Sequence, residues 1–232
     1  MKLAIMQPYF LPYLGYFQLI AAVDKFVLLD DVNYINRGWI SRNQISLLGR
    51  PVWMTLPLSG ASQNRLIRDI DIFADDVWQV RHAKLLSQAF ARAPYGSAAF
   101  EMYRRWLGRA EGNLSTFLHS VVSDVCCYLD IDTEIVPSSS IYAKDSLKGQ
   151  HRILDICKSE GASRYINPPG GLELYDQDSF ARAGIELEFF KPDLYPAILR
   201  TGGRDGVVFS ILELIAYNSR EQIQRCLQVG SS

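Results

Sequence analysis

Short apolar runs alternate with amphipathic segments along this chain, and that alternation is the feature that most constrains its fold. Lys2–Met6 is an apolar run that stops at Gln7-Pro8, and Lys25–Leu29 is a second run that stops at two aspartates. Between them, Leu14–Val23 carries apolar residues at helical spacing. Runs this short, bounded by turn residues, indicate buried strands, so the beginning of the chain predicts a strand–helix–strand unit of a parallel sheet.

The middle of the chain has a helical pattern instead. Asp76–Arg92 and Leu114–Leu129 each place apolar residues on one helical face. The strand pattern returns later, over Glu134–Val136, Arg164–Ile166 and Ile185–Phe190. No repeat or long linker divides the chain. We therefore expect a single α/β domain over residues 1–232, with a Rossmann-like, mostly parallel sheet and a helical insertion around residues 75–130.

Composition excludes several classes of protein. Of 232 residues, 48% are hydrophobic and 21% charged, which is typical of a globular fold. The 24 Lys and Arg are balanced by 25 Asp and Glu, so the net charge of -1 does not attract nucleic acid. No apolar run approaches the roughly 20 residues that span a bilayer. Four cysteines without a C-x-x-C pair indicate neither a disulfide framework nor a zinc site, and we expect a cytoplasmic protein.

Three polar clusters follow predicted strands, where open parallel sheets bind their ligands. The first is the loop after Lys2–Met6, which holds Gln7, Tyr9 and other aromatics before Gly15. Proline and glycine suit a tight turn close to a ligand, and the next helix start suits an anion. A rigid connector with core aromatics explains the same residues equally well. No glycine-rich dinucleotide motif or P-loop is present.

The second cluster follows Lys25–Leu29. Two carboxylates directly after a strand point to opposite sides, so they do not form an acid–base dyad, although one can serve as a base. The arginines have the fork geometry that binds phosphate or carboxylate. A solvated ion-pair loop is the alternative, but the density of polar groups favours function. The members of the cluster are Asp30, Asp31, Arg37, Trp39, Arg42 and Asn43.

The third cluster holds Asn167 and Gly170 directly after Arg164–Ile166, and an ordinary loop-to-helix turn explains it equally well. Of the three histidines, His82 lies within the predicted helix Asp76–Arg92. A lone histidine on a helix is more often structural than catalytic. No two histidines stand at metal-ligand spacing, so we predict no metal site.

Motifs along nearly the whole chain resemble one protein family. They are Ala4–Phe17, Asp24–Val27 with Asp30–Val32, Arg37–Ile40 with Arg42–Ile45, Trp78 with His82, Ala93–Tyr95, Arg152–Leu154, Gly161–Pro168, Gly170-Gly171 and Leu174–Asp176. Together these segments resemble the WbqC-like family. Such proteins are encoded among genes for O-antigen and other surface-polysaccharide synthesis, often near enzymes that make nucleotide-linked amino sugars. The resemblance therefore implies a place in polysaccharide biosynthesis.

The leading hypothesis that follows from this resemblance is an N-acyl or aminoacyl transferase acting on a nucleotide-linked amino sugar. One alternative is a nucleotidyl transferase whose first loop cradles phosphates, and another is a non-catalytic sugar-binding subunit. The expected partner is a small-molecule nucleotide sugar, with an acyl or aminoacyl donor left unspecified. We expect no nucleic acid and no membrane span, and leave assembly into a homo-oligomer open.

The resemblance and the residue types together define a predicted site. His82, Asp30 and Asp31 are the candidate bases, and His82 is favoured because the histidine pKa of about 6.5 lies near working pH. We expect the insertion to pack over the carboxyl edge of the sheet and to bring His82 within reach of the aspartates. Gln7, one aspartate and Asn167 are expected to converge on one cleft. The predicted substrate-binding residues are Gln7, Tyr9, Arg37, Trp39, Arg42, Asn43, Asn167 and Gly170.

Overall fold

A parallel sheet forms the centre of the computed structural model, which describes residues 1–73, 75–110, 112–142, 147–168, 170, 174–203 and 206–227. Within these residues the sheet has five strands in the order β10-β9-β1-β2-β8. They are β1 (Lys2–Met6), β2 (Lys25–Leu28), β8 (Glu134–Val136), β9 (Arg164–Asn167) and β10 (Glu186–Phe189). Counted along the chain, the order is that of a Rossmann fold, and the winding reverses beside β1. The predicted fold class is therefore confirmed.

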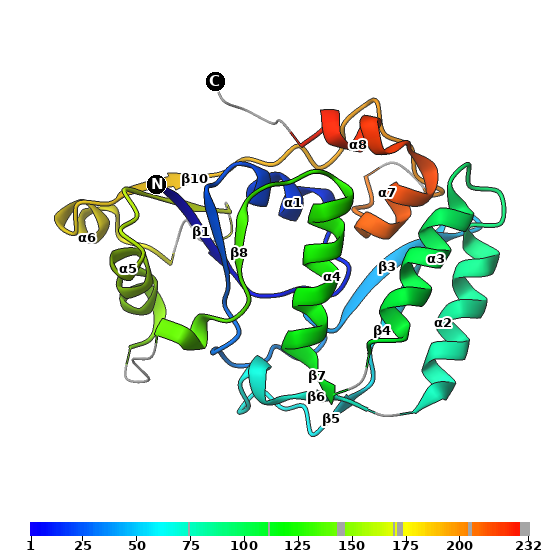
Figure 1. The fold of residues 1–232 in the computed structure, drawn as a ribbon, viewed down its shortest axis with the longest axis horizontal. Helices are drawn as coiled ribbons and strands as arrows, with labels where there is room; N and C mark the ends of the chain where they lie inside the picture. The colour runs from blue at the N-terminus through cyan, green and yellow to red at the C-terminus, as the bar shows by residue number, and fades with distance from the viewer. Residues whose placement is uncertain are drawn as a thin grey trace.

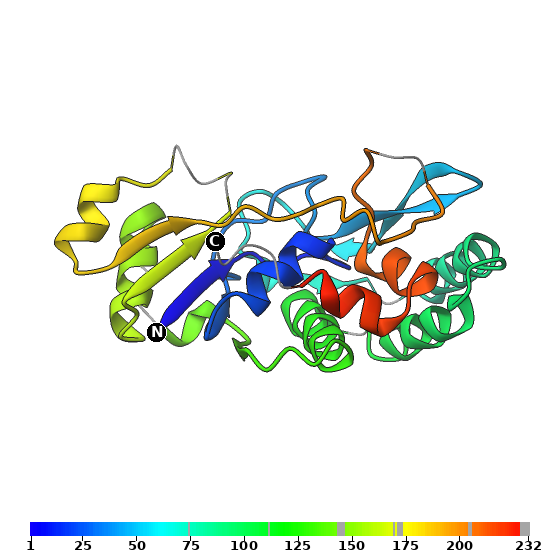
Figure 2. The ribbon, with the colours of Figure 1, turned by 90° about the horizontal axis from the view of Figure 1, so that it is seen from above.

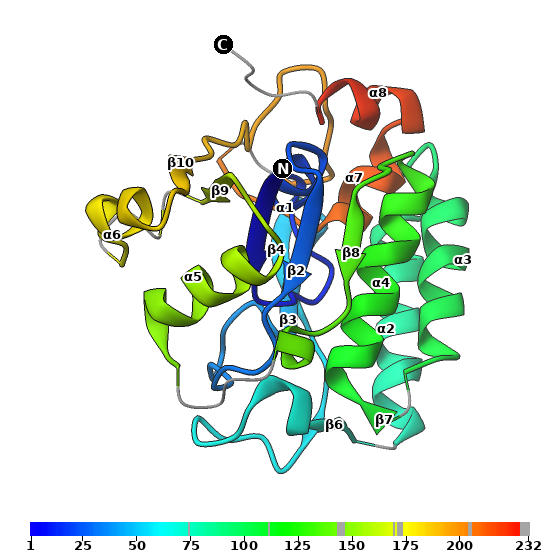
Figure 3. The same cartoon turned by 60° about the vertical axis from the view of Figure 1, so that its left-hand side comes forward.

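Both faces of this sheet are covered, which explains why its strands are continuous apolar runs. In β1, Ala4 packs into one core cluster, while its neighbours Leu3 and Ile5 pack into another. Alternate side chains of a strand point to opposite faces, so a doubly covered strand must be apolar throughout. The first face carries α1 (Leu14–Ala21) and α4 (Leu114–Tyr128). The second carries α5 (Gly149–Ser159) and α6 (Gln177–Arg182), as Figure 3 shows.

The predicted helical insertion lies between β2 and β8. Its helices are α2 (Asp76–Ala89), α3 (Gly96–Leu107) and α4. α2 packs on β3 (Arg42–Leu47), while α3 lies along α7 (Ile211–Tyr217). α2 and α3 stand at the end of the molecule away from α6, whereas α4 lies between them and the sheet (Figures 1 and 2). The insertion thus extends the molecule beyond the sheet, around the hairpin that β3 forms with β4 (Arg50–Thr55).

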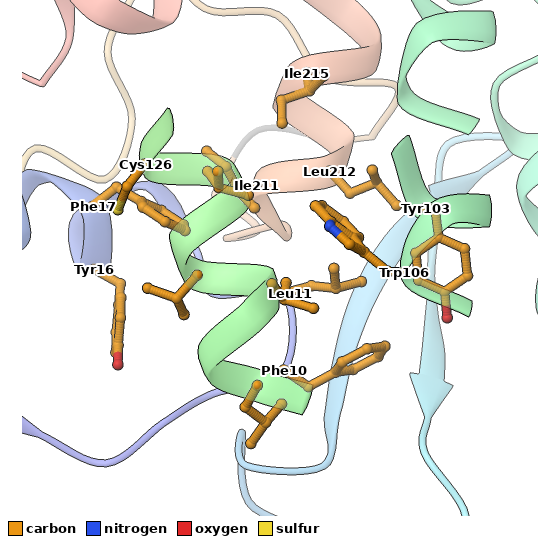
Figure 4. Close-up of a cluster of buried hydrophobic side chains, with 14 of the residues drawn as sticks. Phe10, Leu11, Tyr16, Phe17, Tyr103, Trp106, Cys126, Ile211, Leu212 and Ile215 are labelled. Carbon is orange, nitrogen blue, oxygen red and sulfur yellow. The ribbon is translucent and has the colours of Figure 1, made fainter. Parts of the chain in front are cut away.

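One apolar core joins the sheet to this extension. Phe10, Leu11 and Trp106 are fully buried in it, next to side chains of α7 (Figure 4). Gly96 starts α3 at a point where no larger residue fits, because a Cβ there would lie 2.2 Å from the Phe90 carbonyl oxygen. The extension therefore shares the core of the sheet and has no separate one among the described residues.

Short elements complete the described chain. They are β4 (Arg50–Thr55), β5 (Leu58–Ser59), η1 (Ile67–Asp69), β6 (Asp71–Ile72), β7 (Gly112–Asn113), η2 (Ser139–Tyr142) and α8 (Arg220–Arg225). α8 begins with the capping box that its sequence indicates, in which Ser219 and Gln222 bond to each other's backbone amides. No helix in the described ranges has the length and apolar character that a membrane crossing requires.

Candidate functional site

A pocket of about 540 Å³ opens at the carboxyl edge of the sheet. The segment after β2 forms one wall, and the start of α5 forms the other. Rossmann-ordered sheets bind their ligands at this edge. Its polar lining comes from Asp31, Asn33, Arg68, Lys148, Gln150 and Arg152. We call it the larger pocket, because a smaller pocket of this site lies on the other side of Asp30 and Asp31.

Asp31 is held in the wall of the larger pocket by Arg152. The two side chains form an ion pair, and only 10% and 6% of their surfaces are exposed. The Arg152 guanidinium also donates to the carbonyl oxygens of Tyr142 (2.7 Å) and Ser139 (2.8 Å). A buried charge needs such partners. Arg152 therefore fixes the position of the Asp31 carboxylate.

Asp30 is enclosed by hydroxyl and amide donors and is 1% exposed. Its carboxylate accepts hydrogen bonds from the hydroxyls of Ser115 (2.6 Å) and Ser138 (2.7 Å) and from the Ser139 amide (3.1 Å). The Ser139 hydroxyl in turn accepts from the Asp30 amide and donates to the Asp31 carboxylate. These bonds tie the end of β2 to α4 and to the segment after β8.

A smaller pocket of about 320 Å³ lies on the Asp30 side of this pair. Asp31 lines the larger pocket and Asp30 the smaller one, while Arg68 lines both. The other polar side chains of the smaller pocket belong to Asp69, Asn113, Ser115, Thr116, His119, Ser138 and Ser140. Over the described ranges, no three His, Cys, Asp or Glu side chains are grouped to hold a metal ion.

His82 lies away from both aspartates. Its Nδ1 shares a hydrogen bond of 2.6 Å with the Tyr103 hydroxyl, and its ring packs against Phe10 and Trp78. Burial lowers the pKa of His82 from 6.5 to about 4, although a hydrogen bond with the Thr55 backbone acts in the opposite direction. The expected contact with the aspartates is not formed, because α2 packs on β3. These contacts favour a structural role for His82.

The first loop packs into the core. Asn43 is 1% exposed, and its amide donates to the carbonyl oxygens of Phe10 (3.1 Å) and Leu11 (2.6 Å). The Gln7 carbonyl accepts from the hydroxyl of Tyr16, whose ring lies 5.6 Å from that of Tyr9. Burial raises the pKa of Tyr9 to about 12. The contacts of Asn43 and Tyr9 hold the loop in place.

Three residues of the second cluster lie apart from the aspartates, on or beside the β3–β4 hairpin. The Arg42 guanidinium lies over the Trp53 ring at 4.3 Å, and the rings of Trp39 and Trp53 are 5.6 Å apart. Arg37 is exposed, and its φ of 57° is left-handed. None of these residues lines either pocket.

The third cluster lies at the same sheet edge. Asn167 ends β9, accepts from the Tyr165 hydroxyl (3.0 Å) and donates to the Pro168 carbonyl. Gly170 is exposed, and a Cβ added there would meet no atom within 4 Å. Gln7 follows β1, which is the neighbour of β2, and Asn167 ends β9 on the other side of β1. Neither residue lines the larger pocket.

The site predicted from the sequence did not include Arg68, Ser115, Ser139 or Arg152. Ser139 belongs to a serine run directly after a strand, which is a signal that could have indicated it. Arg152 lies on α5, in a segment that resembles the family, whereas Arg68 on η1 and Ser115 on α4 carry no motif. Only the folded chain brings them to the aspartates.

The fold and the pockets define an α/β protein with a charged pocket at the carboxyl edge of a Rossmann-ordered sheet. The chain belongs to the WbqC-like protein family, whose model matches residues 7–225. It is similar to Uncharacterized protein Rv1507c of Mycobacterium tuberculosis, with 29% identity over 216 residues, which is 92% of each chain. No solved structure matches the chain. The family resemblance predicted from the motifs is confirmed.

Proposed function

We propose that the protein transfers an acyl or aminoacyl group onto the amino group of a nucleotide-linked amino sugar. The observation that carries this proposal is the larger pocket, which lies where sheets of this order bind ligands. Its volume of about 540 Å³ lies in the range of small-molecule sites. The substrate class comes from the association of the family with surface-polysaccharide genes. All four cysteines are free thiols, which is consistent with the cytoplasm.

The charges of the larger pocket support a diphosphate ligand. Arg68 and Lys148 line it, and Arg152 is already paired with Asp31. α5 starts at the pocket, and no side chain caps its first turn. Free amides and the helix dipole at such a start favour negative charge. We therefore place the diphosphate between Arg68 and Lys148.

The remaining polar groups suit the hydroxyls of the nucleotide. The position of Asp31 in the pocket wall lets it accept a hydrogen bond from such a hydroxyl. Arg152 holds this carboxylate in one orientation, which is what precise substrate positioning requires. Asp30 is enclosed by serines and serves to support its neighbour.

The contacts of the first loop favour this reading over a nucleotidyl transferase. That alternative needs the loop to present its backbone to phosphates. Instead, Phe10 and Leu11 are buried, Asn43 bonds to their carbonyls, and no residue of the loop lines the larger pocket. A non-catalytic sugar-binding subunit would use the same pocket. It differs from the transferase in that it forms no amide product.

Thermal-shift measurements with nucleotide sugars, acyl donors, nucleoside triphosphates and amino acids test the proposal, since a ligand of the folded state raises Tm. A nucleotide-linked amino sugar should raise Tm most. Incubation with an acyl or aminoacyl donor should then yield the amide product. A shift only with a nucleoside triphosphate and Mg²⁺ would favour the nucleotidyl transferase. Binding without any product across the donors would favour the non-catalytic subunit.

Two charge-removing variants test the location. Arg68→Gln and Lys148→Gln should each weaken nucleotide-sugar binding about tenfold or more, because a hydrogen bond to a charged group contributes roughly 1.5–3 kcal/mol. Arg104→Gln removes the same charge from an exposed site on α3 and should leave affinity unchanged. Equal loss in all three variants would show that only net charge matters.

A further inference from the structure

The two pockets meet at one side chain. Arg68 lines both, and the adjacent carboxylates of Asp30 and Asp31 each line one. The Arg68 backbone is anchored, since its N–H donates to the Asp30 carbonyl (3.0 Å) and its carbonyl accepts from the side-chain amide of Asn113 (2.6 Å). A single ligand bound at Arg68 can therefore reach into both pockets.

The Arg68 guanidinium is available to such a ligand. Its ion-pair contact is with Asp69, at 3.9 Å, and it donates no hydrogen bond to another described residue. The side chain is two-thirds buried. The N–H groups of such a guanidinium are free to donate hydrogen bonds, and their planar arrangement matches two oxygens of a phosphate. In a bound nucleotide sugar, we therefore expect the bond between the diphosphate and the sugar to lie beside the Arg68 guanidinium.

The smaller pocket differs in chemistry from the larger one. Hydroxyls of Thr116, Ser138 and Ser140 line it, together with the imidazole of His119. Hydroxyl groups both donate and accept, which suits the hydroxyls of a sugar. The volume of about 320 Å³ is at the lower end for ligand sites and suits one ring better than a whole nucleotide.

We propose that the smaller pocket is the subsite for the amino-sugar ring, with His119 as the proton acceptor for its amino group. This inference rests on the proposed function and adds to it a place for the sugar and a base that sequence reasoning did not identify. The diphosphate stays at Arg68, the nucleoside occupies the larger pocket, and the ring extends past Arg68 toward α4.

His119 has the properties of a proton acceptor. It stands one helical turn after Ser115, which bonds to Asp30, and its Nε2 shares a hydrogen bond of 3.1 Å with Ser123. Burial lowers the pKa of His119 below its usual 6.5, so the ring is neutral at pH 7. The charged groups that face it across the pocket are Asp30, Arg68 and Asp69.

The transfer step balances with a thioester as the acyl donor. The sugar ammonium loses one proton to solvent, and the neutral amine nitrogen then attacks the carbonyl carbon, so that an N–C bond forms and the C–S bond breaks. The thiolate leaves with the bonding pair, and His119 takes the proton that the nitrogen loses. No electron is gained or lost overall.

Filling the smaller pocket separates this inference from the proposed function. Thr116 is exposed on the first turn of α4, and Thr116→Trp places an indole in the pocket mouth. Calorimetric titration with dTDP and with a dTDP-linked amino sugar should show about tenfold weaker binding of the sugar conjugate and unchanged binding of dTDP. Cys127→Trp, at an exposed position on the last turn of α4, is the matched control and should change neither affinity. Ser140→Phe enters from the opposite wall and should reproduce the effect.

Each result decides one point. If Thr116→Trp and Ser140→Phe bind the conjugate as tightly as the parent protein does, the subsite is elsewhere and the proposed function stands. If the parent binds dTDP and the conjugate equally, the sugar has no subsite and the inference fails. If the parent binds neither dTDP nor the dTDP conjugate, and no nucleotide sugar of the thermal-shift series either, both the proposed function and this inference fail.

Nuclear magnetic resonance of the histidine rings tests the role of His119. Adding the dTDP-linked amino sugar should shift the His119 Cε1–H resonance and lower the pKa of that ring further, because an ammonium group lies beside it. The His82 resonance, enclosed by Trp78 and Tyr103, is the internal reference and should stay in place. A His119 titration that the conjugate leaves unchanged would remove the proton-acceptor role.

Discussion

At the scale of single residues, two adjacent carboxylates have different environments. Asp30 is enclosed by serine hydroxyls, whereas Asp31 pairs with Arg152 and lines the larger pocket. Their opposite directions follow from strand geometry and were predicted from sequence. Their partners could not be predicted, because Ser115, Ser139 and Arg152 lie 85 to 121 positions along the chain from the carboxylates they contact.

Breaking the Asp31–Arg152 pair should destabilise the fold strongly. Arg152→Met leaves a buried carboxylate without its cation, which costs about 3–5 kcal/mol. Urea unfolding measures the loss, and the double variant with Asp31→Asn should recover much of it because no charge is then left unpaired. Arg104→Met, in an exposed pair with Glu101, should stay within about 0.5 kcal/mol of the parent. Equal effects of the two methionine variants would refute a buried ion pair.

Glu213 should make stability depend on pH. It is fully buried and accepts from the amides of Ser46 (3.1 Å) and Gly202 (2.8 Å), and burial raises its pKa from 4.5 to about 7. The folded state therefore holds the proton more tightly than the unfolded state, so stability falls as pH rises from about 4.5 to about 7. At about 1.4 kcal/mol for each pKa unit, the loss is about 3 kcal/mol.

Unfolding free energies between pH 4.5 and pH 8 measure this contribution. In Glu213→Gln the side chain no longer titrates, so the fall with pH should shrink by about 3 kcal/mol relative to the parent. Glu101→Gln, at an exposed position, serves as the control and should keep the parental slope. An unchanged slope in Glu213→Gln would show that another group titrates.

At the scale of elements, the strands of the sheet follow from simple pattern, whereas the β3–β4 hairpin does not. β1 and β2 are buried apolar runs, and their predicted positions agree with the structure. β3 is interrupted by polar residues such as Arg42 and Asn43, so sequence reasoning took it for part of a binding cluster. Asn43 was selected because it is polar, yet its partners are the Phe10 and Leu11 carbonyls of the first loop.

Asn43 should therefore matter for stability more than for binding. In Asn43→Ala the buried carbonyls of Phe10 and Leu11 lose their donor, which costs about 1–3 kcal/mol. Chemical denaturation measures the loss, and calorimetry at a temperature where the variant is folded should give parental affinity for a nucleotide sugar. Parental stability combined with weaker binding would return Asn43 to the substrate-binding residues.

At the scale of the whole molecule, the order of the strands determines where a ligand can bind. Alternating strands and helices predict a parallel sheet, and the carboxyl edge of such a sheet is the expected ligand side. The larger pocket lies there. The predicted convergence of Gln7 and Asn167 on it is not found, because Gln7 belongs to a loop that packs into the core and Asn167 bonds to its own strand and loop. The strand order thus predicts which edge of the sheet holds the pocket, whereas the packing of the loops determines which residues line it.

A crystal structure of the protein with a bound nucleotide-linked amino sugar tests the central claim most directly. The account predicts density for the diphosphate between Arg68 and Lys148, at the start of α5 and beside Asp31. Density on the β3–β4 hairpin instead, over Trp39 and Trp53, would contradict it and return the binding site to the residues of the second sequence cluster.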